Sequence, residues 1–226
     1  MDRYVKGDPA VTPLHGVEAL TQTCPATAPS GGPFTAATWR ALHPGEVRLR
    51  AVATRTVLSA AGDPTVAAAI DPVGGQGACA TTNGADEPGT ANYRLTAATG
   101  AGYTLLGSPT VIADLTVTGT FPELAARLWD VAPDGTQTLV ARGLYRPSGS
   151  GRVVFQLHPG AWRFAAGHVP KLQLLGRDAP YARASNGTFA IAVSALELRL
   201  PVHERPGGQV LPPAAPALPP GATPAP

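Results

Sequence analysis

The chain has 226 residues, of which 44% are hydrophobic and 14% are charged, and its formal net charge is +2. This hydrophobic content is enough for a buried core, which excludes a disordered protein, and the scattered arginines form no basic run of the kind that binds nucleic acid. No segment approaches the roughly 18 uninterrupted apolar residues of a membrane span, and the polar first residues lack the apolar centre of a signal peptide, so neither nucleic acid nor a membrane is expected as a partner.

The chain begins with two segments that precede any strand pattern. Residues 1–8 are interpreted as the last turn of a helix, because Lys6 lies near its end and Gly7 is a good stop signal. Residues 9–45 are rich in proline, glycine and threonine but also carry large apolar anchors, so we expect an ordered connector that packs on the rest of the chain. These anchors are Val17, Leu20, Phe34, Trp39 and Leu42.

A period-two pattern begins at residue 46 and indicates β-strands. Over 46–52 apolar and charged residues alternate, which places Val47, Leu49 and Ala51 on one face. Further strands are expected over 56–60, 93–97, 110–117, 126–131, 138–145, 152–158, 171–175 and 188–200. The 26 glycines and 25 prolines favour short strands joined by turns.

The connections between these strands decide the fold class. Pro133-Asp134-Gly135 is the clearest hairpin turn, and the loop over 62–88 contains a segment, 66–70, that is either one helical turn or part of a strand. No helix follows the strands, as a parallel sheet would require, so residues 46–203 are predicted to form an all-β, jelly-roll β-sandwich. The proline- and alanine-rich tail over 204–226 is expected to be disordered.

The sequence offers no complete catalytic or metal-binding pattern. None of its serines lies in a G-x-S-x-G elbow, its five histidines are spread singly, and its carboxylates form no obvious pair. Asp71, Asp86 and Glu87 could line a calcium-binding loop, although a solvated loop is the simpler interpretation. We therefore expect no cofactor, no metal and no catalytic residue within the chain.

Cys24 and Cys79 are the only cysteines, and their spacing is not that of a zinc or redox motif. A disulfide is the leading interpretation, and two buried free thiols are the alternative. A bond between them would close a long loop, worth about 4 kcal/mol in the chain-entropy model. It would also favour an extracellular or secreted protein.

Three strings together resemble a known family. Residues 126–135 read ARLWDVAPDG, residues 139–146 read LVARGLYR, and residues 167–174 read GHVPKLQL. This order resembles the C-terminal non-catalytic domain, a galactose-binding-like jelly roll, of the X-Pro dipeptidyl-peptidase and cocaine esterase group of serine hydrolases. The signature residues are Trp129, Asp130, Asp134, Gly135, Gly143, Gly167 and His168. Each also has a structural explanation, as a turn former, a core residue or a hydrogen-bonded histidine.

The resemblance implies an accessory role. In that group the catalytic serine, aspartate and histidine precede this domain, so we expect the chain to support the active-site cleft or the assembly of an α/β-hydrolase domain in cis. An apolar patch from Phe34, Trp39 and Leu42 should then be exposed. The alternatives are a module that binds a carbohydrate or polymer surface, and a peptidase or esterase in its own right with an unrecognised site. A peptide, ester or saccharide ligand is compatible with these roles.

Overall fold

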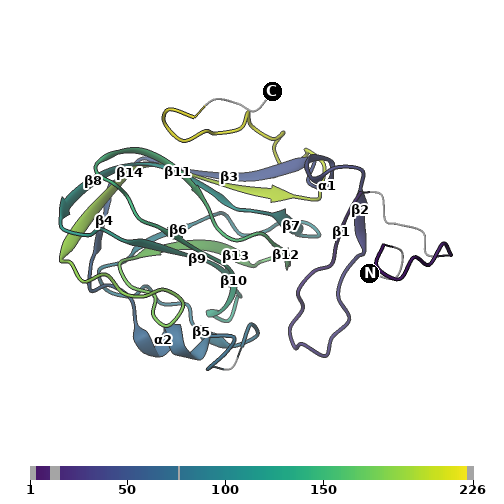
Figure 1. The fold of residues 1–226 in the computed structure, drawn as a ribbon, viewed down its shortest axis with the longest axis horizontal. Coiled ribbons are helices and arrows are strands. Elements are labelled where there is room, and N and C mark those ends of the chain that lie inside the picture. Colours follow the sequence, from purple (N-terminus) through teal and green to yellow (C-terminus); the bar gives the residue numbers. More distant parts are fainter. Residues whose placement is uncertain (1–3, 11–15, 76, 223–226) are drawn as a thin grey trace.

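The computed structural model describes residues 4–10, 16–75 and 77–222, and Figure 1 shows two stacked β-sheets. Within the sheets the strands pair in antiparallel fashion, and the prediction of an all-β sandwich is confirmed. The five-stranded sheet runs in the order β5 (Thr81–Asn83), β10 (Thr136–Tyr145), β9 (Leu124–Val131), β13 (Val169–Leu175) and β6 (Ala91–Arg94). No helix in the described part of the chain is long and apolar enough to cross a membrane.

The second sheet is built around one long strand, β14 (Phe189–Val202). Its order is β11 (Gly151–Gln156), β8 (Thr110–Gly119), β14, β7 (Tyr103–Gly107) and β12 (Gly160–Phe164), and β3 (Gly45–Ala51) and β4 (Arg55–Leu58) also pair with β14. Alternating buried and half-exposed residues along β14 reflect its period of two. The alternation shifts at a bulge after Ser194, where Ala195 has a φ of 46°.

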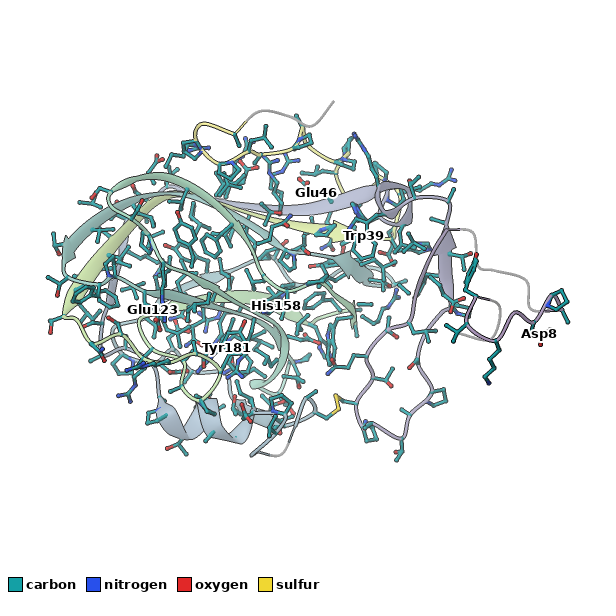
Figure 2. The ribbon with its side chains drawn as sticks, viewed as in Figure 1. Asp8, Trp39, Glu46, Glu123, His158 and Tyr181 are labelled. Atoms are coloured by element: carbon teal, nitrogen blue, oxygen red, sulfur yellow. A yellow bond between two sulfur atoms is a disulfide. The ribbon has the colours of Figure 1, made fainter. Side chains whose placement is uncertain are left out.

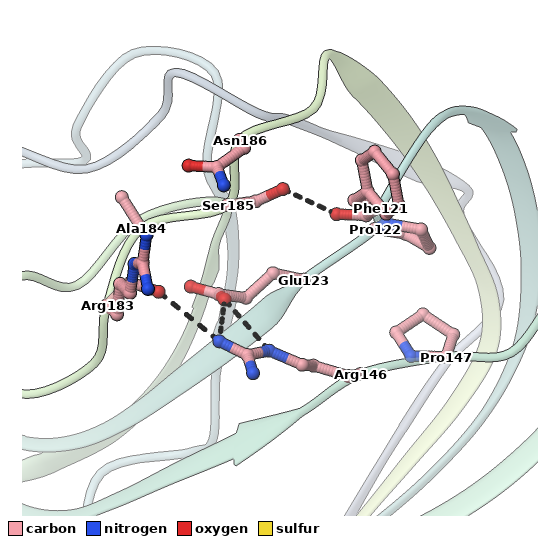
Figure 3. A pocket seen from close by; sticks show the side chains of 9 residues that line it. All are labelled: Phe121, Pro122, Glu123, Arg146, Pro147, Arg183, Ala184, Ser185 and Asn186. Atoms are coloured by element: carbon pink, nitrogen blue, oxygen red, sulfur yellow. Dashed lines mark hydrogen bonds and ion pairs between the residues drawn. The ribbon is translucent and has the colours of Figure 1, made fainter.

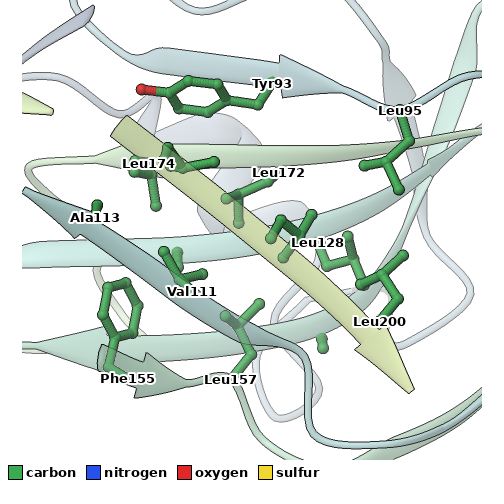
Figure 4. Close-up of a cluster of buried hydrophobic side chains, with 14 of the residues drawn as sticks. Tyr93, Leu95, Val111, Ala113, Leu128, Phe155, Leu157, Leu172, Leu174 and Leu200 are labelled. Carbon is green, nitrogen blue, oxygen red and sulfur yellow. The ribbon is translucent and has the colours of Figure 1, made fainter. Parts of the chain in front are cut away.

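The main core fills the space between the two sheets (Figure 4). Leu128, Leu172 and Leu174 of the five-stranded sheet are fully buried, as are Val111 and Leu200 of the other sheet. Truncating such a side chain to alanine typically costs about 2–5 kcal/mol. This core supplies the main apolar stabilisation of the fold.

The outer face of the five-stranded sheet is also covered. Helix α2 (Pro64–Ala69) and the segment that follows it lie against this sheet (Figure 1), and Ile70 and Ala80 pack with Trp129 of β9. Because both faces are covered, seven of the eight residues of β9 are buried. The segment over 66–70, left undecided from the sequence, belongs to α2, whose N-cap Asp63 accepts a hydrogen bond from the Thr65 backbone N–H at 2.8 Å.

Most of the predicted strands are present, and the Pro-Asp-Gly segment joins β9 to β10 as a hairpin. The strand expected over 93–97 ends earlier, at Arg94. The sequence reading missed β5, β7, β12, the short helix α1 (Trp39–Leu42), and a small hairpin of β1 (Val17–Ala19) and β2 (Phe34–Ala36).

Both ends of the chain differ from expectation. Residues 1–3 of the expected helix remnant lie outside the described residues, residues 4–6 form a turn and a bend, and residues 7–8 are irregular. The expectation of disorder from residue 204 is wrong for the first part of the tail. Leu211 exchanges two backbone hydrogen bonds with Glu46, and Val210 is buried, because this apolar pair follows a glycine turn and reaches the free edge of β3. The tail residues 223–226 lie outside the described residues.

Candidate functional site

Asp130 and His168, two residues of the family signature, form a hydrogen-bonded pair. The Nδ1 atom of His168 lies 2.9 Å from Asp130 Oδ1, and the indole N–H of Trp162 donates to Asp130 Oδ2 at 2.9 Å. Burial raises the pKa of Asp130, and these two hydrogen bonds oppose the rise. Among the hydrogen bonds of the described residues, none joins a serine hydroxyl to a histidine ring.

The other signature residues shape turns and close contacts. Asp134 accepts hydrogen bonds from the backbone N–H and the hydroxyl of Thr136 at 2.9 and 2.7 Å, and Gly135 has a φ of 84°, as the hairpin turn requires. Gly167 also has a φ of 84°, and a Cβ atom on Gly143 would lie 3.0 Å from Leu157 Cα. These positions fit a role in the fold.

The disulfide prediction is confirmed, since Cys24 and Cys79 are bonded with their Cα atoms 5.3 Å apart. Figure 2 shows the sulfur–sulfur bond between the connector and the segment that covers the five-stranded sheet. The bond indicates a non-cytoplasmic compartment. It also fixes the connector to the sandwich at a point far from its own strand pairing.

A buried ionic cluster, which the sequence reading missed, lies on the outer face of the five-stranded sheet. Asp178 is fully buried and accepts from Arg127 Nε at 3.1 Å and Nη2 at 2.5 Å, and from Arg142 Nη2 at 3.0 Å. Arg127 also pairs with Glu87 at 3.1 Å. A sequence signal for it was Arg127, which with Asp130 interrupts the apolar residues of strand β9.

Trp129 is hydrogen-bonded to a residue of the same cluster, and two of the three carboxylates considered for a calcium site are paired with arginines. The indole N–H of Trp129 donates to Gln173 Oε1 at 3.0 Å. Asp86 pairs with Arg94 at 2.7 Å, Glu87 is held by Arg127, and no group of three or more His, Cys, Asp or Glu side chains in the described residues could hold a metal ion. The loop carboxylates are therefore engaged in ion pairs, and Asp71 caps its own turn.

Arg142 borders a small cavity of about 220 Å³, which His158 and Tyr181 also line. Its guanidinium lies 4.9 Å from the centre of the Tyr181 ring, and within the described part of the chain its Nε and Nη1 atoms have no hydrogen-bond partner. Burial lowers the pKa of Arg142, while Asp178 opposes this change.

The expected apolar patch on the connector is not present as one surface. Leu42 is buried, Phe34 packs on the His203 ring at 4.7 Å between centroids, and only Trp39 is substantially exposed, at 47%. The prediction fails because the short helix α1 turns Leu42 inward, while β2 brings Phe34 against the sandwich.

A cavity of about 510 Å³ is formed by three connections at one end of the sandwich (Figure 3). They are the β8–β9 turn with Phe121 and Glu123, the end of β10 with Arg146, and the loop over 183–186 that precedes β14. Glu123 is fully buried, and Arg146 donates to its Oε2 atom at 2.8 and 3.2 Å. The Oε1 atom of Glu123 has no hydrogen-bond partner among the residues that the structure describes.

The fold of this chain is similar to part of two solved hydrolase structures. No protein-family model and no curated protein matches the sequence. An aminopeptidase structure from a marine sediment Thaumarchaeota archaeon matches 87% of this chain and 42% of its own, with a TM-score of 0.57 and 13% identity. A CocE/NonD family hydrolase from Staphylococcus aureus matches 89% of this chain and 44% of its own, with a TM-score of 0.56 and 12% identity.

These matches confirm the expected resemblance of fold to a domain of that hydrolase group. At such identities they establish the fold alone. The chain spans less than half the length of either hydrolase.

Proposed function

We propose that the chain is the non-catalytic accessory domain of a serine hydrolase, and that it packs in cis on an α/β-hydrolase domain. The observation that carries the proposal is the coverage of the match. The fold covers nearly the whole of this chain but less than half of two longer hydrolases. In this proposal residues 1–8 are the end of the last helix of the preceding α/β-hydrolase domain, 9–45 form the connector, 46–203 the galactose-binding-like sandwich and 204–226 the tail.

The hydrogen bonds and ion pairs inside the sandwich agree with a non-catalytic, accessory role. Its Asp130–His168 pair is tied to Trp162, and its buried arginines are engaged by Asp178 and Glu87. These groups hold segments of the domain together, and a hydrolytic site would need a nucleophile beside the base.

The connector offers the contact surface in this proposal. Figure 1 shows the β1–β2 hairpin and α1 at the end of the sandwich where the N-terminal segment lies. Trp39 is exposed there, 6.3 Å from the His43 ring between centroids. Large aromatic side chains are enriched at protein interfaces. The disulfide would keep this surface in a fixed orientation, in a secreted protein.

The carbohydrate- or polymer-surface alternative requires exposed aromatic side chains in one plane. Two aromatic side chains near the ends of the sandwich, Trp39 and Phe121, are exposed. They do not share one surface, because Figure 2 shows Trp39 far from Glu123, which lies close to Phe121 in the chain. A flat polymer-binding face is therefore not favoured.

The proposal is tested by comparing the isolated chain with the full product of its gene. The full product should hydrolyse an aminoacyl or acyl ester and be labelled by a serine-directed phosphonate, whereas the isolated chain should do neither. A Trp39→Ala substitution in the full product should loosen the connector in hydrogen exchange, and Val52→Ala, at an exposed residue outside the connector, is the control. Stoichiometric phosphonate labelling of a serine in the isolated chain would overturn the proposal.

A further inference from the structure

The tail that follows Leu211 lies over the outer face of the seven-stranded sheet. Figure 1 shows it in yellow, outside β3 and β11 and on the side away from the five-stranded sheet. Residues 212–219 form neither helix nor strand nor turn, and four of these eight residues are prolines. Because proline fixes φ near −65°, such a segment favours the extended polyproline II conformation.

The burial of the tail repeats every three residues, which is the period of a polyproline II helix. Ala214 and Ala217 are partly buried, whereas the residues beside them are exposed. Three residues per turn place these two alanines on one face of the segment, and Pro213 and Pro216 together on another. The tail therefore rests on the sandwich through its alanine face.

A hydrogen bond from the sheet holds the backbone of the tail. The Nη1 atom of Arg199 in β14 donates to the carbonyl oxygen of Ala215 at 2.7 Å. The carbonyls of a polyproline II segment have no partner within the segment, so they are free to accept from outside. Glu197 accepts from Arg199 Nε at 2.6 Å, so the sheet itself orients this guanidinium.

A cavity of about 410 Å³, called here the tail groove, is lined by the tail together with α1, β14 and the residues near them. Trp39, which is 47% exposed, and His43 supply aromatic rings to it, and Arg199 supplies the donor. Protein grooves that recognise proline-rich segments are lined by aromatic side chains. The tail groove thus pairs the features of such a site with a segment of the matching kind.

We propose that the tail groove is a docking site for an extended, proline-rich peptide segment, and that residues 212–218 occupy it as an internal ligand. A segment of another polypeptide with the same spacing of prolines would bind there only in exchange for the tail. Because its φ angles are fixed in advance, such a segment loses little entropy on docking, and a shallow groove with few contacts suffices. The inference does not depend on the accessory role, and it is tested on this chain alone.

The experiment uses the full chain with Ala214→Lys, which places a long cationic side chain on the face that rests on the sandwich. This side chain would meet Arg40 and Arg199, which line the groove, so the tail should be released. In NMR spectra the signals of the Trp39 indole N–H and of the amides of residues 40–43 and 199 should then shift. Ala215→Lys is the matched control, because it makes the same change at an exposed position and keeps the carbonyl that Arg199 binds, so these signals should stay in place.

A synthetic peptide of residues 211–222 is then added to the chain that carries Ala214→Lys. It should return the shifted signals to their wild-type positions, whereas the wild-type chain, whose own tail fills the groove, should not respond at the same peptide concentration. A peptide that carries Pro213→Gly and Pro216→Gly should bind about tenfold more weakly, because glycine loses more backbone entropy on docking.

Three results would overturn the proposal. The first is an equal response of the signals to Ala214→Lys and to Ala215→Lys, including no response to either. The second is the absence of any return towards the wild-type spectrum when the peptide is added. The third is equal affinity for the proline and glycine peptides, since the groove would then not recognise a proline-rich segment.

Discussion

Replacing Asp178 by asparagine should destabilise the protein more than any single change on its surface. Asp178 is fully buried and accepts three hydrogen bonds from two guanidinium groups, those of Arg127 and Arg142. Asparagine keeps the volume but removes the charge, which leaves Arg127 with Glu87 and leaves Arg142 without an ion-pair partner among the described residues. Breaking a buried ion pair by removing one partner costs about 3–5 kcal/mol.

The matched control is Asp114→Asn. Asp114 pairs with Arg152 at 3.4 Å, and both side chains are about half exposed, so the pair is screened by solvent. Removing such a pair costs about 0–1 kcal/mol. The two variants therefore make the same chemical change in a buried and in an exposed ion pair.

The free energy of unfolding is measured by urea denaturation with the disulfide intact, with tryptophan fluorescence as the signal. Trp129 lies in the same polar layer, through Gln173, and reports on it directly. The reasoning is refuted if Asp178→Asn lowers the free energy of unfolding by no more than Asp114→Asn does.

Three further predictions concern the connector, a turn and a buried lysine. Replacing Cys24 and Cys79 by serine should lower the free energy of unfolding by up to about 4 kcal/mol and make the connector the first site of cleavage in limited proteolysis; an unchanged cleavage pattern would contradict this. Gly62→Ala should lower the melting temperature, because the φ of Gly62 is 130° and a Cβ atom there would lie 2.1 Å from the Arg177 carbonyl oxygen. Gly149→Ala is the control and should leave the melting temperature unchanged, because a Cβ atom at Gly149 would meet open space. Burial lowers the pKa of Lys171 from 10.5 to about 8, so the unfolded chain binds more protons between these values and stability should rise with pH there. In urea denaturation at a series of pH values, Lys171→Met should remove that rise, and an identical slope in both proteins would count against it.

The strands with a clear period of two could be predicted from the sequence, and others could not. In β3 and β14 charged and apolar residues alternate because one face meets solvent. Strand β7 is buried throughout, so its sequence shows no alternation, and β12 alternates only over Trp162–Phe164, which is too short a stretch to identify a strand.

The two polar sites were not visible in the sequence for a related reason. Glu123, Arg146 and Ser185 come from three separate connections, and Asp178 meets Arg127 and Arg142 only after the sheet has formed. Local patterns cannot report such contacts, because the folded topology, and no spacing along the chain, brings the groups together. The Pro-Asp-Gly hairpin, in contrast, is encoded by adjacent residues and was predicted.

The central position of β14 has a consequence for how the protein is made. Val47 and Val57, in β3 and β4, face Leu200 and Ile191 of a strand that is among the last parts of the sandwich to be synthesised. During translation these early strands emerge with their pairing edges open, and such edges are prone to associate with other chains. A nascent polypeptide that stops before Phe189 lacks the strand that joins both halves of this sheet, so protection by chaperones should matter most until that segment leaves the ribosome.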